Sequence, residues 1–333
     1  MKTRRVKILG TGKYMPSRMV TDEEMDLRLG TPRGWVRKMT DVAVRHFASD
    51  EETASYMGAR AAKAALAEAG LSLADIDCLV CTSGTREQAL PSTASLIQQA
   101  LGEELYGVPA FDIDATCISF LVGLDIMSYL IEAGRYRHVL LVSTEIASVG
   151  LNWNDKKSAA LFGDGAAAVV IGPSAGEDKS GIVGASIRTY SNGARLSEIR
   201  GGGTRIHPRE HNAETEADFL FRMNGEAIFK MASKLLPGFV DELLAPSGSR
   251  MADFQAVIPH QGSAMAMRLM RKKLGISAEQ LVYITPNHGN TIAASIPMGL
   301  HEAVSQGKVR RGDRVLLIGT AAGLSLGGMI LDY

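Results

Sequence analysis

Cysteine is scarce in this sequence, which holds only Cys78, Cys81 and Cys117 among its 333 residues. An odd number of cysteines in a long chain favours a reducing compartment over a disulfide framework. Cys78 and Cys81 have CxxC spacing, but residues 77–82 read as a strand, in which side chains three apart point to opposite faces. No second cysteine pair exists to complete a zinc site. The sequence therefore predicts neither a metal centre nor a redox disulfide.

Long apolar runs and an excess of one charge are also absent. No stretch approaches the roughly 18 apolar residues of a membrane-spanning helix. The 36 basic residues balance 36 acidic ones, so no global field attracts nucleic acid. The basic residues 1–5 precede an apolar run that is too short for a signal peptide. We expect a cytoplasmic protein without a membrane or nucleic-acid partner, in which any acidic partner binds a local patch.

Short β-rich runs alternate with alanine-rich segments of helical character, which is typical of an α/β fold. Helices are predicted over residues 52–70, 90–101, 118–134, 225–244 and 264–275. A chain of this length can form two layered units with a large core.

A faint internal repeat divides the chain into two halves. In each half, a Glu-Ala pair leads through a glycine and basic residues to a buried strand, 139–143 in the first half and 315–319 in the second. A turn-rich, charged connection at 173–181 separates the halves. We therefore predict an N-terminal unit over residues 1–172 and a C-terminal unit over residues 173–333.

Cys117 lies where an extended apolar run ends and a helical pattern begins. Unpaired N–H groups and the helix dipole at such a junction favour the thiolate, which is the nucleophilic form. A lone cysteine in apolar surroundings can also be a small buried hydrophobe. His260 and Asn290 likewise follow short apolar strands, where α/β sheets present catalytic groups, although a histidine by itself can be structural. Together the three residues predict covalent chemistry.

Four motifs resemble the ketoacyl-acyl-carrier-protein synthase III group of the thiolase fold: Asp114-Ala-Thr-Cys117, Phe162-Gly-Asp-Gly-Ala166, Pro259-His-Gln261 and His288-Gly-Asn-Thr291. The similarity runs from the first strand, at residues 6–10, to the C-terminal run ending at residue 331. It implies duplicated βαβαβ halves in an α-β-α-β-α arrangement. It also implies β-ketoacyl synthesis at the start of fatty acid biosynthesis, with coenzyme A and carrier-protein thioesters as substrates and no resident cofactor.

The resemblance assigns roles to the three residues. Cys117 takes an acyl group from acyl-CoA, and the oxyanion is held by the N–H of Cys117 and one from the turn with Ala322 and Gly323. Malonyl-acyl carrier protein then loses CO₂, and His260 and Asn290 stabilise the enolate. The family usually has a run of glycines where this chain has Ala321-Ala322-Gly323, and alanine does not favour a positive φ.

The same resemblance suggests where the substrates bind. Coenzyme A is expected at Trp35, Arg37, Lys38, Lys156 and Ser263, the tryptophan stacking on adenine. The chain departs from the family at Met39 and Lys156, where arginines are usual, and at Ser263, where asparagine is usual. The acidic carrier protein is expected at the basic residues Lys230, Arg268, Arg271, Lys272 and Lys273. A solvated helix face is the alternative, and Met265 stands where the family prefers arginine.

Residues 195–218 have no clear periodicity and are predicted to form an excursion loop near the site, in which His207 and His211 are solvated. The resemblance implies a homodimer, in which the segment around Leu90 closes the partner's acyl pocket, and Leu90 replaces a phenylalanine common in acetyl-specific members. Non-decarboxylative condensation, acyl transfer in secondary metabolism and a non-catalytic partner subunit are alternatives. A thiolase is disfavoured because no second cysteine follows Cys117.

Overall fold

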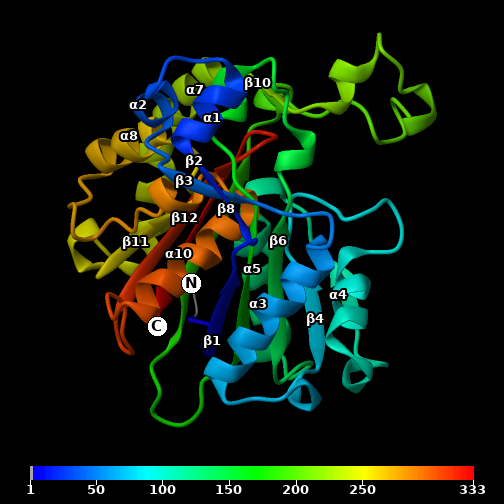
Figure 1. Ribbon diagram of the computed structural model, residues 1–333. Coiled ribbons are helices and arrows are strands. Elements are labelled where there is room, and N and C mark those ends of the chain that lie inside the picture. The colour runs from blue at the N-terminus through cyan, green and yellow to red at the C-terminus, as the bar shows by residue number, and fades with distance from the viewer. Residues whose placement is uncertain (1–2) are drawn as a thin grey trace.

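Two β-sheets form the centre of the molecule (Figure 1). The computed structural model describes residues 3–333. The first sheet has the order β1-β7-β6-β4-β5, with bounds Val6–Tyr14, Gly165–Pro173, Val139–Glu145, Cys78–Cys81 and Ala110–Asp112. The second has the order β11-β12-β13-β8, with bounds Ala256–Pro259, Arg314–Ala321, Ser325–Asp332 and Gly181–Thr189.

The two sheets repeat one pattern of strand pairing. In the first, β1, β7 and β6 are successively antiparallel, while β6, β4 and β5 are parallel. In the second, β8, β13 and β12 are antiparallel and β12 and β11 are parallel. A parallel bridge between Val257 and Leu281 takes the place of β5. The predicted duplication of the halves is therefore confirmed, and the chain passes between the sheets over residues 174–180; a domain boundary at 172/173 stays a prediction.

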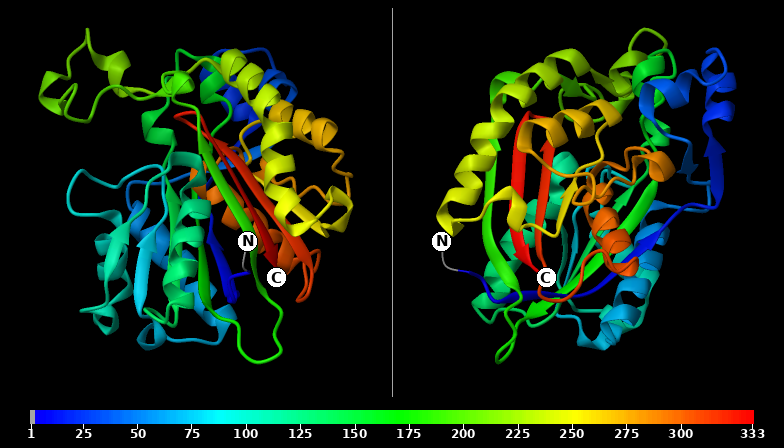
Figure 2. Two further views of the ribbon diagram at one scale, coloured as in Figure 1. Left: turned by 180° about the vertical axis from the view of Figure 1, so that it is seen from behind. Right: turned by 90° about the vertical axis from the view of Figure 1, so that its left-hand side faces the viewer.

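Helices fill the space between the sheets and cover their outer faces (Figure 2). The long helices are α3 (Ala54–Ala69), α4 (Thr93–Leu101), α5 (Ser119–Glu132), α7 (Gly225–Leu244), α8 (Ala264–Leu274) and α10 (Ser295–Ser305). Leu124 of α5 and Leu300 of α10 share one buried cluster with strands of both sheets. α3 and α4 pack on the outer face of the first sheet, and α7 and α8 on that of the second. The layers therefore run α-β-α-β-α, as predicted.

All five helices predicted from the sequence are present, with small shifts at their ends. α3 shows why its sequence is helical and rich in alanine. Thr53 caps its first turn by accepting from the Tyr56 N–H, and Gly70 ends it with φ 65°. A Cβ on Gly10 of β1 would lie 2.3 Å from the Ala65 carbonyl oxygen, so small residues on both sides allow helix and strand to approach closely.

Short elements that the sequence patterns do not reveal gather at one end of the sheets. They are β2 (Arg18–Thr21), α1 (Asp22–Leu29), α2 (Trp35–Thr40), β3 (Val44–Phe47), α6 (Lys156–Ala159) and α9 (Thr285–His288). Several of them share a separate small core that includes Met25, Val36 and Phe162. Because these elements are only four to eight residues long, they hold their shape through packing rather than through their own periodicity.

The polar segment predicted as an excursion projects from the body as an arm (Figures 1 and 2). The short pair β9 (Ser197–Glu198) and β10 (Arg222–Met223) closes its base. His207 and His211 are exposed and flank a 3-10 turn, Pro208–Glu210. The prediction of solvated loop histidines is confirmed.

The CxxC pair also lies as predicted. Cys78 faces the core between the sheets and Cys81 faces the α3 and α4 side, and both thiols are free. Within residues 3–333, no group of three or more His, Cys, Asp or Glu side chains could hold a metal ion. No helix in that range is long and apolar enough to cross a membrane.

Candidate active site

Cys117 sits in a tight turn between β5 and α5. Residues Thr116–Ile118 form a single 3-10 turn, and Thr116 has φ 51°, which is unusual for a β-branched residue. The Ser119 hydroxyl stabilises this turn: it donates to the Thr116 carbonyl at 2.7 Å and accepts from the Ala115 N–H at 2.9 Å. The turn therefore presents Cys117 at the N-terminus of α5.

The predicted thiolate is wrong for the free enzyme. Burial, followed by the charge of Glu145, raises the pKa of the Cys117 thiol to about 12. Hydrogen bonds from the Ala322 N–H and the Thr116 side chain lower it only in part. Desolvation of the sulfur outweighs the helix terminus, because an enclosed thiolate loses more hydration than one helix end returns. Cys117 rests as a thiol.

The turn between β12 and β13 reaches the nucleophile from the other half. The Ala322 N–H points to the Cys117 sulfur, and the Thr116 hydroxyl donates to the Ala322 carbonyl at 3.3 Å. Within this turn the positive φ, 122°, falls on Gly323 and not on either alanine. The alanines in place of the family's glycines are therefore tolerated here, and the N–H groups of Cys117 and Ala322 both bond to the sulfur.

His260 follows β11 and is nearly buried. Its Nδ1 lies 2.8 Å from the Ser295 hydroxyl. Burial lowers the pKa of His260 to about 4, so the ring is neutral at pH 7. Gly319 separates the ring from the nucleophile turn: a Cβ there would lie 3.1 Å from His260 Cβ and 3.0 Å from Ile118 Cγ2.

Asn290 is held so that its amide nitrogen is directed inward. The Ile292 N–H donates to Asn290 Oδ1 at 2.9 Å, which identifies the oxygen and leaves Nδ2 with only a long contact, 3.4 Å, to the Gly262 carbonyl. The Asn290 backbone pairs with residues 161–163 through bonds of 2.8 and 3.2 Å. Asn290 is therefore a fixed amide donor with an uncommitted N–H.

Gly84 brings the nucleophile and amide segments together. A Cβ on Gly84 would lie 3.0 Å from Ile292 Cγ2 and 3.3 Å from the Thr116 backbone. The structure thus assembles Cys117, His260 and Asn290 at one end of both sheets. Cys117 and His260 follow β5 and β11, as predicted, but the predicted strand before Asn290 is wrong, because the short helix α9 precedes it.

The sequence assigned no role to two supporting residues, Ser295 and Gln261, although Gln261 ends the motif Pro259-His-Gln261. Ser295 orients His260, and Gln261 ties the His260 segment to the next one: its Nε2 donates to the Val282 carbonyl and its Oε1 accepts from Thr285. Both are fully buried polar side chains. Apart from that motif, the sequence shows only that each is a polar residue within an otherwise apolar run. Many buried polar residues without a functional role show the same pattern, because their hydrogen bonds are made within the core.

The residues predicted for coenzyme A lie on the end elements. Trp35 begins α2, Arg37 forms an ion pair with Asp41 at 3.7 Å, and Lys38 is exposed on the same helix. Lys156 begins α6 and reaches the Gly30 carbonyl at 3.1 Å, so α6 lies beside the connection to α2. The Ser263 hydroxyl caps α8 by accepting from the Ala266 N–H. The first four residues share one region, while Ser263 stands at the start of the neighbouring helix.

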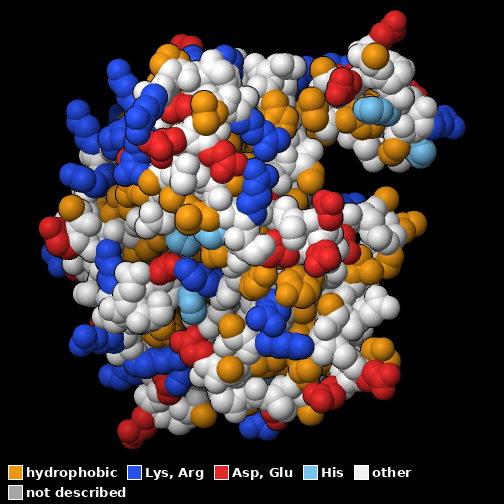
Figure 3. All heavy atoms as spheres, in the orientation of Figure 1, with side chains coloured by type: hydrophobic (Ala, Val, Ile, Leu, Met, Phe, Trp, Pro, Cys, Tyr) orange, Lys and Arg blue, Asp and Glu red, His pale blue; other side chains and the backbone are white. Residues whose placement is uncertain are grey.

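The basic residues predicted for a carrier protein are exposed. Lys230 lies on α7, and α8 carries Arg268, Arg271, Lys272 and Lys273. Figure 3 shows Lys and Arg side chains gathered on the side of the molecule where α2 and α8 lie. A cavity of about 130 Å³ between α8 and Tyr283 is lined by Arg268, Arg271 and Asp41. Asp41 also contacts Arg37, so the two predicted binding regions adjoin.

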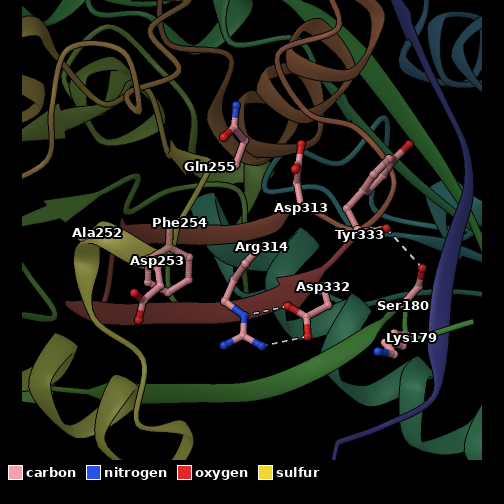
Figure 4. Close-up of a pocket in the computed structure, with 11 residues that line it drawn as sticks. Lys179, Ser180, Ala252, Asp253, Phe254, Gln255, Asp313, Arg314, Asp332 and Tyr333 are labelled. Atoms are coloured by element: carbon pink, nitrogen blue, oxygen red, sulfur yellow. Dashed lines mark hydrogen bonds and ion pairs between the residues drawn. The ribbon is translucent and has the colours of Figure 1, made fainter.

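Leu90 does not line a pocket of its own subunit, because 83% of it is exposed in the loop before α4. The larger cavity of about 510 Å³ also lies away from the site, at the opposite ends of β11, β12 and β13 (Figure 4). Its charged residues are largely paired, as Arg314 is with Asp332.

Fold and site together define a condensing acyltransferase of the thiolase fold. Residues 111–191 match the model of 3-oxoacyl-[acyl-carrier-protein] synthase III, and residues 244–333 match the model of its C-terminal part. The chain belongs to the β-ketoacyl-[acyl-carrier-protein] synthase III family, since it is 37% identical to the member from Acidiphilium cryptum (strain JF-5) over 99% of both chains.

Solved structures agree with this placement. The 3-oxoacyl-[acyl-carrier-protein] synthase III from Aquifex aeolicus VF5 superposes with a TM-score of 0.88 at 34% identity, covering 98% of this chain and 100% of that one. The priming β-ketosynthase of the R1128 polyketide pathway superposes with a TM-score of 0.88 at 27% identity, covering 99% and 96%.

Proposed function

We propose that this chain catalyses a decarboxylative Claisen condensation between an acyl group on Cys117 and malonyl-carrier protein. One observation carries the proposal. Cys117, the Ala322 N–H, the neutral His260 ring and the Asn290 amide converge at one end of the duplicated sheets, each held by contacts that leave a reactive atom uncommitted.

In the first half-reaction, the Cys117 sulfur forms a bond to the thioester carbon of acyl-CoA. The N–H groups of Cys117 and Ala322 stabilise the tetrahedral oxyanion. The carbon–sulfur bond to coenzyme A then breaks, and the thiol proton leaves with the coenzyme A sulfur. Because burial keeps the resting thiol protonated, the proton must move as the substrate binds or reacts.

In the second half-reaction, malonyl-carrier protein loses CO₂, and the electron pair of the broken carbon–carbon bond forms an enolate. His260 and Asn290 donate to the enolate oxygen. The ring donates through Nε2 in the tautomer whose Nδ1 is an acceptor, for which the Ser295 hydroxyl turns its one hydrogen from the Ile292 carbonyl, 2.8 Å away, to Nδ1. The enolate carbon attacks acyl-Cys117, and the released sulfur takes up a proton. The thioesters supply all the electrons, so no resident cofactor is required.

Both substrates are expected to approach from the side of α2 and α8. Trp35, Arg37, Lys38 and Lys156 suit adenine and phosphates. Arg268 and Arg271 adjoin that region through Asp41 and are positioned for an acidic carrier.

The proposal includes a homodimer in the cytoplasm. β5 ends the first sheet with an unpaired edge, and Phe111 on it is 36% exposed. Tyr106 and Leu90 are exposed as well. Such an edge suits pairing with a second copy. Three free cysteines suit a reducing compartment.

A second candidate is the priming condensation of a secondary-metabolite pathway. It is favoured by the full-length similarity to the R1128 priming ketosynthase. The two candidates share the chemistry above and differ in the starter acyl group and the carrier protein. A panel of acyl-CoAs with carrier proteins from both kinds of pathway separates them.

Radiolabelled acyl-CoA tests the mechanism. We expect label on wild-type protein and none on Cys117→Ser, because a hydroxyl is a far poorer nucleophile than a thiol that can ionise. His260→Ala and Asn290→Ala should take up label but lose malonyl decarboxylation, each costing on the order of 2.7–4 kcal/mol of transition-state stabilisation. Condensation by Cys117→Ser at the wild-type rate, or equal loss of both half-reactions in the other two variants, contradicts the proposal.

A further inference from the structure

Glu145 is a buried carboxyl group at the end of β6 that the reaction above does not use. The Gly84 N–H donates to one of its oxygens at 2.7 Å, and the Thr85 N–H and hydroxyl donate to the other at 2.9 and 2.6 Å. The Ala293 N–H bonds to it as well. Burying a carboxyl group is costly, so convergence of several donors on one marks a maintained feature.

One donor, Ala293, belongs to the segment that carries Asn290, while Gly84 and Thr85 belong to the loop after β4, which packs against both reacting segments. Gly84 packs directly against the Thr116 backbone, one residue before Cys117, and against Ile292. Ala293 follows Ile292, whose own N–H fixes the Asn290 amide. Through Gly84 and Ala293, the carboxyl group therefore contacts both sides of the site.

These two segments need such support. Thr116 and Ile292 have φ 51° and 48°, and both are β-branched. β-branched residues rarely adopt this conformation, and it persists only where neighbouring contacts impose it. Gly84 is wedged between the two residues and is held in turn by Glu145.

We propose that Glu145 is a positioning residue of the condensation, whose carboxyl group fixes the segment of Cys117 relative to the segment of Asn290. The proposal rests on the function proposed above, because it takes the roles of Cys117 and Asn290 from there. The step that needs this geometry is carbon–carbon bond formation, in which acyl-Cys117 and the enolate held by Asn290 must meet.

The charge of Glu145 supplies an independent readout. It is the second cause, after burial, of the raised pKa of Cys117. His260 lies on the other side of the nucleophile turn and stays neutral because burial lowers its pKa to about 4. Burial raises the pKa of Glu145 itself to about 8, although the hydrogen bonds that its carboxyl group accepts act to lower that pKa. Removing the carboxyl group should therefore lower the pKa of the Cys117 thiol.

The test compares Glu145→Gln with Glu52→Gln in the full-length protein. Glu52 is a matched control, since it is buried and accepts from the Ser17 N–H, the Ser49 N–H and the Tyr14 hydroxyl, away from the site. For each variant, three quantities are measured: acyl label on Cys117, the rate of condensation of preloaded acyl-enzyme with malonyl-carrier protein, and iodoacetamide alkylation of Cys117 against pH.

In Glu145→Gln we expect condensation of the preloaded enzyme to fall 10- to 100-fold, while labelling changes less than threefold. The alkylation curve should move to lower pH. Glu52→Gln should leave the ratio of the two half-reactions and the alkylation curve unchanged. If the two variants behave alike in all three measurements, Glu145 is only structural and the inference is overturned. If wild-type Cys117 takes no label, the proposed function has failed instead.

Two further variants keep the test decisive if Glu145→Gln folds poorly. Glu145→Asp keeps the charge but shortens the side chain, so condensation should fall while the alkylation curve stays near that of the wild type. Thr85→Val removes one donor and should reduce condensation in the same direction but less. Wild-type condensation in both variants overturns the inference.

Discussion

At the scale of single residues, the reactivity of each catalytic group depends on the hydrogen bonds that fix its position in the protein. His260, Asn290 and Cys117 each have one atom tied to the protein and another left for substrate. Ser295 is the clearest example, because its hydroxyl lies 2.8 Å from His260 Nδ1 and 2.8 Å from the Ile292 carbonyl. One side chain therefore sets the position of the imidazole ring and of the loop that carries Asn290.

Ser295→Ala should lower malonyl decarboxylation about tenfold while acyl labelling of Cys117 stays near wild type. The loss leaves His260 Nδ1 buried without its partner, which costs on the order of 1–3 kcal/mol. CO₂ release and labelling are measured in parallel. Ser128→Ala is the control, since Ser128 is equally buried and donates to the Asp125 carbonyl on α5. Equal decarboxylation by the two variants would show that Ser295 does not orient the ring.

At the scale of elements, α8 combines an apolar side with a basic one. Met267 and Met270 pack into the core below the second sheet, while Arg268 and Arg271 stay exposed beside the cavity that includes Asp41 and Tyr283. Ser263, three residues after His260, caps the N-terminus of the helix, so the position of the helix is tied to that of the active site. A carrier bound along α8 would lie close to where its thioester has to enter.

Charge reversal on α8 distinguishes binding of the carrier protein from acylation of Cys117. Arg268→Glu combined with Arg271→Glu should raise the KM for malonyl-carrier protein about tenfold and leave acylation by acyl-CoA unchanged, since exposed ion pairs contribute up to about 1 kcal/mol each. Lys63→Glu, on the exposed side of α3 in the opposite outer layer, is the control. An unchanged KM in the double variant would mean that the helix face is only solvated.

At the scale of the whole molecule, one subunit leaves large apolar side chains exposed in its first half. The edge strand β5 and the exposed Tyr106 and Leu90 lie in the first half, beyond the outermost pairing of its sheet. Their exposure in a chain with a large buried core suits an isologous contact. In the dimer that we propose, Leu90 of each copy would bound the acyl site of the other.

Mixed dimers test this arrangement and the starter preference together. Light scattering at micromolar concentration should give a dimer. We expect the wild-type enzyme to prefer medium-length or branched starters, because Leu90 is smaller than the phenylalanine of acetyl-specific members and leaves more room for the acyl chain. In mixed dimers, one subunit carries Cys117→Ser and Leu90→Phe and the other is wild type, so activity comes from the wild-type Cys117. Preference should then shift to acetyl-CoA. Each buried methylene contributes about 0.8 kcal/mol, so the ranking should change by one or two orders of magnitude.

Leu27→Phe is the control, since Leu27 is 85% exposed on α1. A fully active monomer would contradict the prediction. So would a mixed dimer in which Leu90→Phe in one subunit leaves the order of preference among acyl-CoA starters unchanged.

Local sequence was enough for the main elements and for the identity of the reacting groups. Alanine-rich periodicity, glycine at helix ends and short buried runs predict α3, α5, α7 and α8 and the strands between them, because these signals act within a few residues. The positions of Cys117 and His260 after β5 and β11 predict that they meet, because equivalent strand ends of the two duplicated sheets lie at the same end of the molecule, whereas Asn290 follows the short helix α9.

The properties that only the tertiary structure decided depend on residues far apart in the chain. A helix terminus predicts a thiolate at Cys117, but enclosure by the second half and Glu145 raises its pKa instead. Glu145 and Ser295 gain their roles from loops 61 and 35 residues away, at Gly84 and His260, which no local pattern records. Desolvation and charge act through space. The sequence therefore identifies the reacting residues, while the packing around them determines their protonation state and orientation.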